Sequence, residues 1–206
     1  MSSAAICLVG PPGVGKTTLV NFLLSIGFWK VSSSDALREK ESVDLEFARV
    51  HPVTQTMEKG GLCCNDALFI ALEAKLERVE SNMLVLDGAI RRYGQARPVI
   101  KALQNRKSQI GVILFECPKL VCLSRISRRR QEMIDNLQDP RPEDDPKLAH
   151  ERMLLYFKHL PGVLQGIKEE GLKTLIVDAT EDPTSVLRQS VVHVSQYVPH
   201  AAKHLN

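Results

Sequence analysis

Aromatic residues are scarce in this sequence, at 5% of 206 residues with one tryptophan. The basic stretch at residues 125–130 has no neighbouring aromatic side chains on which bases could stack, so no nucleic-acid partner is expected. No apolar run reaches the roughly 20 residues that cross a bilayer, and no basic-then-apolar signal pattern is present. The sequence therefore predicts a soluble, cytoplasmic protein that does not bind membranes.

The chain also lacks cysteine spacing typical of metal sites, internal repeats and flexible linkers. The net charge of +3 is too small to indicate a polyanionic partner, and 44% hydrophobic residues are typical of a folded protein. We expect one domain over residues 1–206. Two cysteines lie in apolar runs, which favours free thiols in a reducing compartment. The five cysteines are Cys7, Cys63, Cys64, Cys117 and Cys122.

Five apolar, β-branched runs predict strands at residues 4–9, 28–32, 83–87, 111–116 and 173–178. The segments between them have helical spacing, and this alternation predicts an α/β fold with a parallel sheet.

Two segments between these strands are longer than simple crossovers need. Residues 35–82 contain a proline and a Gly-Gly pair, which predicts several short helices with breaks. Residues 125–143 are polar and charged, so a mobile flap is expected there and a packed core element is not. The C-terminal part predicts a helix that stops near Pro161-Gly162, a last helix at 184–198 and a frayed tail of eight residues.

A glycine-rich segment, GPPGVGKTT at residues 10–18, follows the first apolar run. It matches G-x-x-x-x-G-K-[ST] between a predicted strand and a predicted helix, the context in which this pattern binds phosphate. Glycines let backbone N–H groups surround an anion, and the helix start adds positive partial charge. Lys16 is expected to reach the β- and γ-phosphates, while a hydroxyl of Thr17 or Thr18 helps to hold Mg²⁺.

A second polar cluster follows the predicted strand at 83–87, which ends in Asp87-Gly88 and is followed by Arg91 and Arg92. Ligands of open parallel sheets bind at the carboxyl ends of the strands, so these side chains are expected beside the glycine-rich segment. Phosphoryl transfer requires positioning, Mg²⁺ and positive charge. Six arginines are candidates for that charge: Arg38, Arg91, Arg125, Arg129, Arg141 and Arg152.

These motifs together resemble the nucleoside monophosphate kinases, adenylate kinase in particular. SSSDALR at residues 32–38 is similar to the family's S-T-G-D-L-L-R, whose arginine binds the acceptor phosphate. DGAIRRYGQ at residues 87–95 resembles D-G-F-P-R-x-x-x-Q, which implies that Arg91 contacts the monophosphate and Gln95 reads the adenine edge of AMP. Residues 57–62 look like the segment whose backbone lines the acceptor base.

The resemblance continues toward the C-terminus. RISRR at residues 125–129 is similar to R-[IL]-x-x-R at the family's lid hinge, and RPED at 141–144 stands where R-x-D-D is expected. Arg152 and Tyr156 fit the R-L-x-x-Y that follows. Only ten residues, 131–140, separate Arg130 from Arg141 and they contain no cysteine, so the resemblance is to the short-lid type.

By resemblance, the fold is a P-loop three-layer fold with a five-stranded parallel sheet of order 2-3-1-4-5. Its core would comprise residues 1–34, 83–130 and 141–206, with a helical monophosphate-binding insert at 35–82 and a short lid at 131–140. The implied cofactors are ATP and Mg²⁺, the partners are small nucleotides, and the protein is expected to be a monomer.

The resemblance also implies the site residues. Those expected to be catalytic are Lys16, Arg91, Arg125, Arg129, Arg141 and Arg152. Those for ATP are Gly10, Pro11, Pro12, Gly13, Val14, Gly15, Lys16, Thr17, Thr18, Arg125, Arg129 and Ala179. Those for the monophosphate are Ser33, Arg38, Gly60, Leu62, Gly88, Arg91, Gln95, Arg141 and Arg152. Mg²⁺ is assigned to Thr18 and, through water, to Asp87.

The sequence departs from the family mainly around the acceptor. Ala89-Ile90 replace Phe-Pro, Leu62-Cys63-Cys64-Asn65 replace L-V-P-D, and Glu143 replaces the first lid aspartate. ATP-dependent phosphorylation of AMP is the preferred interpretation. A UMP/CMP kinase, a P-loop kinase for another small acceptor, and a nucleotide-binding regulatory protein without turnover stay open as alternatives. A GTP switch is not expected, because no N-K-x-D signature follows the fourth predicted strand.

Overall fold

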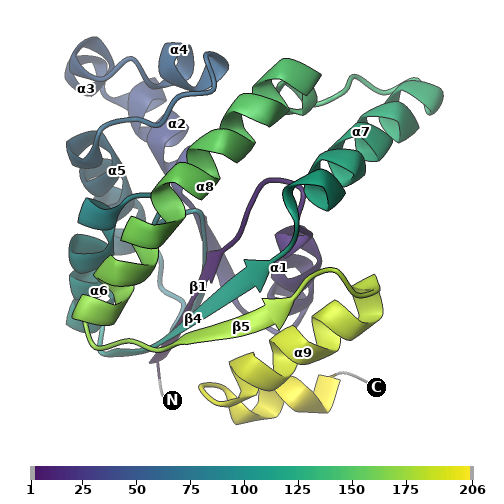
Figure 1. Ribbon diagram of the computed structural model, residues 1–206. Helices are drawn as coiled ribbons and strands as arrows, with labels where there is room; N and C mark the ends of the chain where they lie inside the picture. The colour runs from purple at the N-terminus through teal and green to yellow at the C-terminus, as the bar shows by residue number, and fades with distance from the viewer. Residues whose placement is uncertain (1–2, 205–206) are drawn as a thin grey trace.

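The computed structural model describes residues 3–204, and a five-stranded sheet lies at its centre (Figure 1). The strands are β1 (Ser3–Val9), β2 (Trp29–Ser32), β3 (Met83–Asp87), β4 (Ser108–Glu116) and β5 (Thr174–Asp178). All four neighbouring pairs are parallel, in the order β2-β3-β1-β4-β5. The predicted α/β fold class and strand order are confirmed.

Helices cover both faces of the sheet and create two cores. In β1, Ala5 and Cys7 pack into one core, and Ile6 and Leu8 pack into the other. This alternation follows from the two-residue period of a strand, and burial on both faces explains why the strand is continuously apolar. The helices are α1 (Lys16–Ser25), α2 (Ser33–Val43), α3 (Leu45–Val50), α4 (Val53–Glu58), α5 (Asn65–Glu77), α6 (Ala96–Asn105), α7 (Lys119–Asp135), α8 (Pro146–Glu169) and α9 (Pro183–Ser195). Three short 3₁₀ helices are η1 (Tyr93–Gln95), η2 (Pro142–Asp144) and η3 (Pro199–His204).

The long segment between β2 and β3 forms α2 to α5, the series of short helices that its breaks predict. The side chain of Ser32 accepts a hydrogen bond from the Asp35 amide and caps α2. Pro52 precedes α4 and Gly60-Gly61 follow it. In Figure 1 these helices gather at one end of the molecule, with the upper part of α8 passing beside them.

The predicted stop of a helix at Pro161-Gly162 is wrong, because α8 continues through Pro161 to Glu169. A proline inside a helix removes one backbone hydrogen bond. Beyond it, however, Val163 and Ile167 are buried in the core. A Cβ on Gly166 would lie 2.9 Å from the carbonyl oxygen of Tyr93, so this glycine allows α8 to pack closely against η1. Packing therefore outweighs the local signal.

The expectation of a flap without core contacts at residues 125–143 is wrong in its first part. The helix α7 continues through it to Asp135, and Ile126 within the segment is buried, as is Cys122 one turn before it. These two residues are four apart and therefore lie on the same face of the helix. The many arginines around them make the segment look polar when only its composition is considered. Residues 131–140, the predicted lid, comprise the end of α7, a turn at 136–137 and an irregular connection, and most of them are exposed.

The C-terminal tail is also more ordered than the composition suggests. Residues 199–204 form η3, in which Ala201 is fully buried, while the last two residues of the predicted frayed tail lie outside the described residues. Among the helices of residues 3–204, none has the length and apolar character needed to cross a membrane.

Candidate phosphoryl-transfer site

The glycine-rich segment forms the turn between β1 and α1. Gly13 has φ +76°, and a Cβ there would lie 2.6 Å from the carbonyl oxygen of Cys122 on α7. A larger residue is excluded because both the conformation and the space require glycine. The helix α1 begins at Lys16. The N–H groups of its first turn have no partner within the helix, so they can donate to an anion bound at this turn.

Lys16 lies folded over the turn. Its Nζ donates hydrogen bonds to the carbonyl oxygens of Gly10, at 2.8 Å, and Pro11, at 3.0 Å. Burial lowers the pKa of Lys16 to about 8, and the nearby Asp87 carboxylate opposes that shift. The ammonium group is thus mostly protonated at neutral pH and is weakly solvated, which suits a phosphate ligand.

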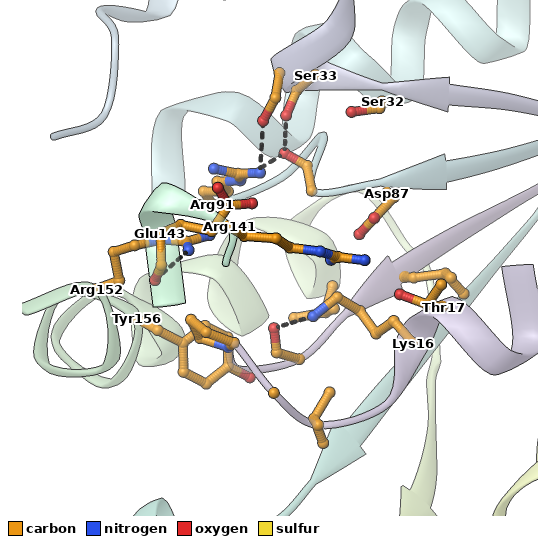
Figure 2. A pocket seen from close by; sticks show the side chains of 18 of the residues that line it. Lys16, Thr17, Ser32, Ser33, Asp87, Arg91, Arg141, Glu143, Arg152 and Tyr156 are labelled. Carbon is orange, nitrogen blue, oxygen red and sulfur yellow. Dashed lines mark hydrogen bonds between the residues drawn. The ribbon is translucent and has the colours of Figure 1, made fainter. Parts of the chain in front are cut away.

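Oxygen-bearing side chains face the same space. Asp87 ends β3 at the position paired with Leu8 of β1, directly beside the turn. Figure 2 shows the Thr17 hydroxyl and the Asp87 carboxylate on the same side as Lys16, and Thr18 lines the same cavity. Hydroxyl and carboxylate oxygens suit Mg²⁺, which keeps several waters and needs few protein ligands. Across residues 3–204, no cluster of three His, Cys, Asp or Glu side chains forms a metal cage.

Arg91 is held against the end of β3 by the turn that follows it. The carbonyl oxygen of Gly88 accepts hydrogen bonds from Ser33 Oγ, at 2.7 Å, and from Arg91 Nε, at 3.0 Å. Arg91 Nη2 also donates to Ser34 Oγ at 3.5 Å (Figure 2). Gly88 has φ +69°, and a Cβ there would collide with the Arg91 guanidinium. Burial lowers the pKa of Arg91, and Asp87 opposes that shift.

Gln95 is buried beneath this turn and uses both ends of its amide inside the protein. Its Oε1 accepts hydrogen bonds from the backbone N–H groups of Arg91, at 2.7 Å, and Arg92, at 3.1 Å. Its Nε2 donates to Asn65 Oδ1 at 3.1 Å. Arg92 Nη2 donates to the Leu62 carbonyl oxygen at 2.9 Å. The resemblance implies that Gln95 contacts the adenine edge of AMP. The structure shows that Gln95 also has hydrogen-bond partners inside the protein.

Two of the predicted arginines on α7 make defined contacts. The guanidinium of Arg129 forms a two-pronged ion pair with Asp144, whose side chain is 1% exposed. Arg125 Nη1 donates to the Ala179 carbonyl oxygen at 2.8 Å, which links α7 to the turn after β5. In this arrangement Arg129 neutralises a buried carboxylate.

The other two arginines come from the connection before α8 and from α8 itself. Arg152 Nη1 donates to the Glu143 carbonyl oxygen at 3.5 Å, and burial lowers the pKa of Arg152. Arg141 is exposed, and Figure 2 shows its side chain extending toward the interior of the site. Tyr156, one turn beyond Arg152, has a buried hydroxyl without a hydrogen-bond partner among residues 3–204. The resemblance of Arg152 and Tyr156 to R-L-x-x-Y does not predict a role for this hydroxyl.

A single cavity of about 1350 Å³ brings these groups together. Its walls include Lys16, Arg38, Asp87 and Arg91, with Gly60 and Leu62 at the insert. Every residue predicted for ATP, the monophosphate or Mg²⁺ lines it, except Pro11 and Ala179.

Pro11 and Ala179 do not line the cavity, but their carbonyl oxygens accept hydrogen bonds from Lys16 and Arg125, which do. The expected contact of Ala179 with ATP is not supported, because Ala179 is fully buried and its amide donates to the Glu116 carbonyl oxygen. The following residues, 180–183, line the cavity in its place.

A parallel sheet of this order, a glycine-rich turn leading into a helix and a lysine at that helix start together define a P-loop protein. Residues 6–144, about two thirds of the chain, match a family model described as "AAA domain". The chain belongs to this AAA domain family, a P-loop NTPase-like family that includes kinases. No curated protein matches the sequence.

Proposed function

We propose that the protein is a nucleoside monophosphate kinase that moves the γ-phosphoryl group of ATP to a monophosphate, with AMP as the preferred acceptor. Membership of a family that includes kinases supports the general class. The specific acceptor comes from the resemblance of residues 32–38 and 87–95 to adenylate kinase motifs.

The observation that carries this proposal is that one cavity has two cationic walls. We name the turn of residues 10–18 and Asp87 the donor half, and the cluster of Ser33, Arg38, Arg91 and Gln95 with residues 60–65 the acceptor half. Lys16 belongs to the donor half, and Arg38 and Arg91 face the cavity from the acceptor half. A protein that only binds a nucleotide does not need a second cationic wall, whereas transfer between two phosphate groups does.

The chain's own residues divide the work of transfer. Loop amides and Lys16 would hold the donor phosphates, and Arg91 would hold the acceptor phosphate in line with them. Arg125, Arg129, Arg141 and Arg152 line the same cavity, where they would neutralise developing charge. Asp87 with Thr17 or Thr18 would hold Mg²⁺, which supplies further charge when bound. Exposed residues 131–140 would close over the site and exclude water.

The acceptor base would lie against the insert. The insert side of the cavity contains Met57, Leu62 and Cys63, which offer an apolar surface to a base. The amide of Gln95, which favours adenine by resemblance, is already hydrogen-bonded. A UMP/CMP kinase is therefore the second candidate.

One assay tests these proposals: ADP formation from Mg-ATP with AMP, CMP, UMP and GMP in turn, with a blank that contains water as the only acceptor. Turnover with AMP at the highest kcat/KM supports the lead, and a preference for CMP or UMP selects the second candidate. Tight ATP binding without acceptor-dependent turnover would contradict both and indicate a regulatory binding protein.

A further inference from the structure

The turn that carries Arg91 is fastened by one buried side chain. Gln95 is 2% exposed, and its Oε1 accepts from two consecutive backbone N–H groups, those of Arg91 and Arg92. Backbone N–H groups can only donate, so the oxygen of the amide must face them and the nitrogen must face the other way. The nitrogen meets Asn65 Oδ1, so every contact agrees with a single orientation of the side chain.

The same amide also joins the turn to the insert. Asn65 is the first residue of α5, and the residues before it form the wall where the acceptor base is expected. A second link runs parallel to it, from Arg92 Nη2 to the Leu62 carbonyl oxygen. The two hydrogen bonds join residues 62–65 to residues 92–95, which are 30 apart in sequence. The phosphate-binding arginine and the base-binding wall are therefore fixed to one another.

We propose that Gln95 is a positioning residue: it holds Arg91 in place and fixes residues 62–65 of the insert relative to it. This inference rests on the proposed function. Without the Gln95 amide, the backbone N–H groups of Arg91 and Arg92 and Asn65 Oδ1 would lose these partners, and each buried group left unpaired carries a desolvation cost. The hydrogen bonds from the backbone N–H groups of Arg91 and Arg92 to Gln95 also explain how Arg91 is held in place although Ala89-Ile90 replace the family's Phe-Pro in the turn.

The kinetic test compares Gln95→Leu with Gln104→Leu, a matched change at an exposed position of α6 outside the cavity. Gln95→Leu leaves two buried N–H groups without an acceptor, so kcat/KM should fall about ten- to hundredfold by a similar factor for every monophosphate used. KM for ATP should change less than about twofold. A loss confined to AMP, with CMP or UMP turnover kept, would overturn the proposal because the amide would then contact adenine.

Asn65 supplies a second pair of variants in case Gln95→Leu fails to fold. Asn65→Asp keeps an oxygen acceptor for Gln95 Nε2, whereas Asn65→Leu removes it. The loss in acceptor kcat/KM should be clearly smaller for Asn65→Asp. Equal losses in the two variants would show that the Gln95–Asn65 hydrogen bond does not position the site.

Hydrogen exchange of the protein without nucleotides separates this inference from the proposed function. In Gln95→Leu, the amides of Arg91 and Arg92 should exchange at least about tenfold faster, while the amides of β1 keep their protection. Unchanged exchange at both residues would overturn the inference even if the protein is a kinase. Failure of the wild type to phosphorylate any monophosphate would overturn the proposed function, and the exchange result alone would then decide the role of Gln95.

Discussion

The two halves of the cavity are built in different ways. In the donor half, Lys16 donates to carbonyl oxygens five and six residues before it, and nine consecutive residues contain all of this half except Asp87. In the acceptor half, Ser33 bonds to the Gly88 carbonyl across 55 residues, and Arg91 reaches Ser34 across 57. The donor half is therefore a local structure, and the acceptor half exists only after the insert has packed against the sheet.

Because of this difference, the two halves should respond differently to substitutions. The donor half depends on backbone conformation, as at Gly13, where any side chain would collide with α7. The acceptor half depends on side-chain hydrogen bonds from the starts of α2 and α5 to residues 88–95 after β3. We expect changes in the donor half to weaken ATP use with every acceptor. We expect changes in the acceptor half to lower kcat/KM for the monophosphate and to leave ATP binding unchanged.

The largest effect is expected for Lys16→Ala. It removes a cation at the donor phosphates, so kcat should fall by about 100- to 1,000-fold or more. Lys101→Ala, an exposed lysine of α6, is the matched control. Steady-state ADP formation and a thermal melt check the result, and wild-type turnover in a folded Lys16→Ala protein would contradict the donor assignment.

Arg91→Ala should have the next largest effect and should separate the two halves. The kcat/KM for the acceptor should fall by about 100-fold, because a buried charge at the acceptor phosphate is lost. The dissociation constant of ATP, measured by calorimetry without acceptor, should stay within about twofold. Arg97→Ala is the control, since its side chain is 71% exposed and lies outside the cavity. If ATP binding weakened as much as acceptor use, the division into two halves would be wrong.

The pH dependence should also differ between the halves. Because burial lowers the pKa of Lys16 to about 8, the free protein loses this cation as pH rises through that value. The kcat/KM for ATP should therefore fall above about pH 8 and approach a tenfold loss per further pH unit. Arg91 stays protonated at these pH values although burial lowers its pKa, so acceptor binding should change little. An equal fall in kcat/KM for ATP and for the acceptor above pH 8 would contradict the assignment of Lys16 to the donor half and Arg91 to the acceptor half.

The smallest effect concerns the two threonines of the donor half. The sequence-based assignment of Mg²⁺ is to Thr18, whereas Figure 2 shows the Thr17 hydroxyl facing the space beside Asp87 and Lys16. We expect Thr17→Val to raise the Mg²⁺ concentration for half-maximal rate about three- to tenfold, and Thr18→Val to raise it less. A Mg²⁺ titration at fixed ATP checks this order, and a larger shift for Thr18→Val would favour the original assignment.

Sequence reasoning worked where the signal was short in range. The strand periodicity, the glycine-rich turn and the acid at the end of β3 all follow from local patterns, and the sheet order agrees with the family resemblance. It was wrong at Pro161, where packing of Gly166 against Tyr93 keeps α8 continuous. It was also wrong for the first part of residues 125–143, where α7 continues to Asp135 and Ile126 is buried among arginines. Ala179 was placed one residue too early to line the cavity.

By itself, the sequence determined the phosphate-binding turn, because Lys16 bonds to the carbonyl oxygens of Gly10 and Pro11 within the segment and the strand and helix that flank the turn are also local. The tertiary structure decided what Gln95 does. Its partners lie on α5 and in the turn after β3, and burial leaves the amide bound to them. A motif match identifies a glutamine, but a buried amide bonds to whichever groups the fold brings within reach.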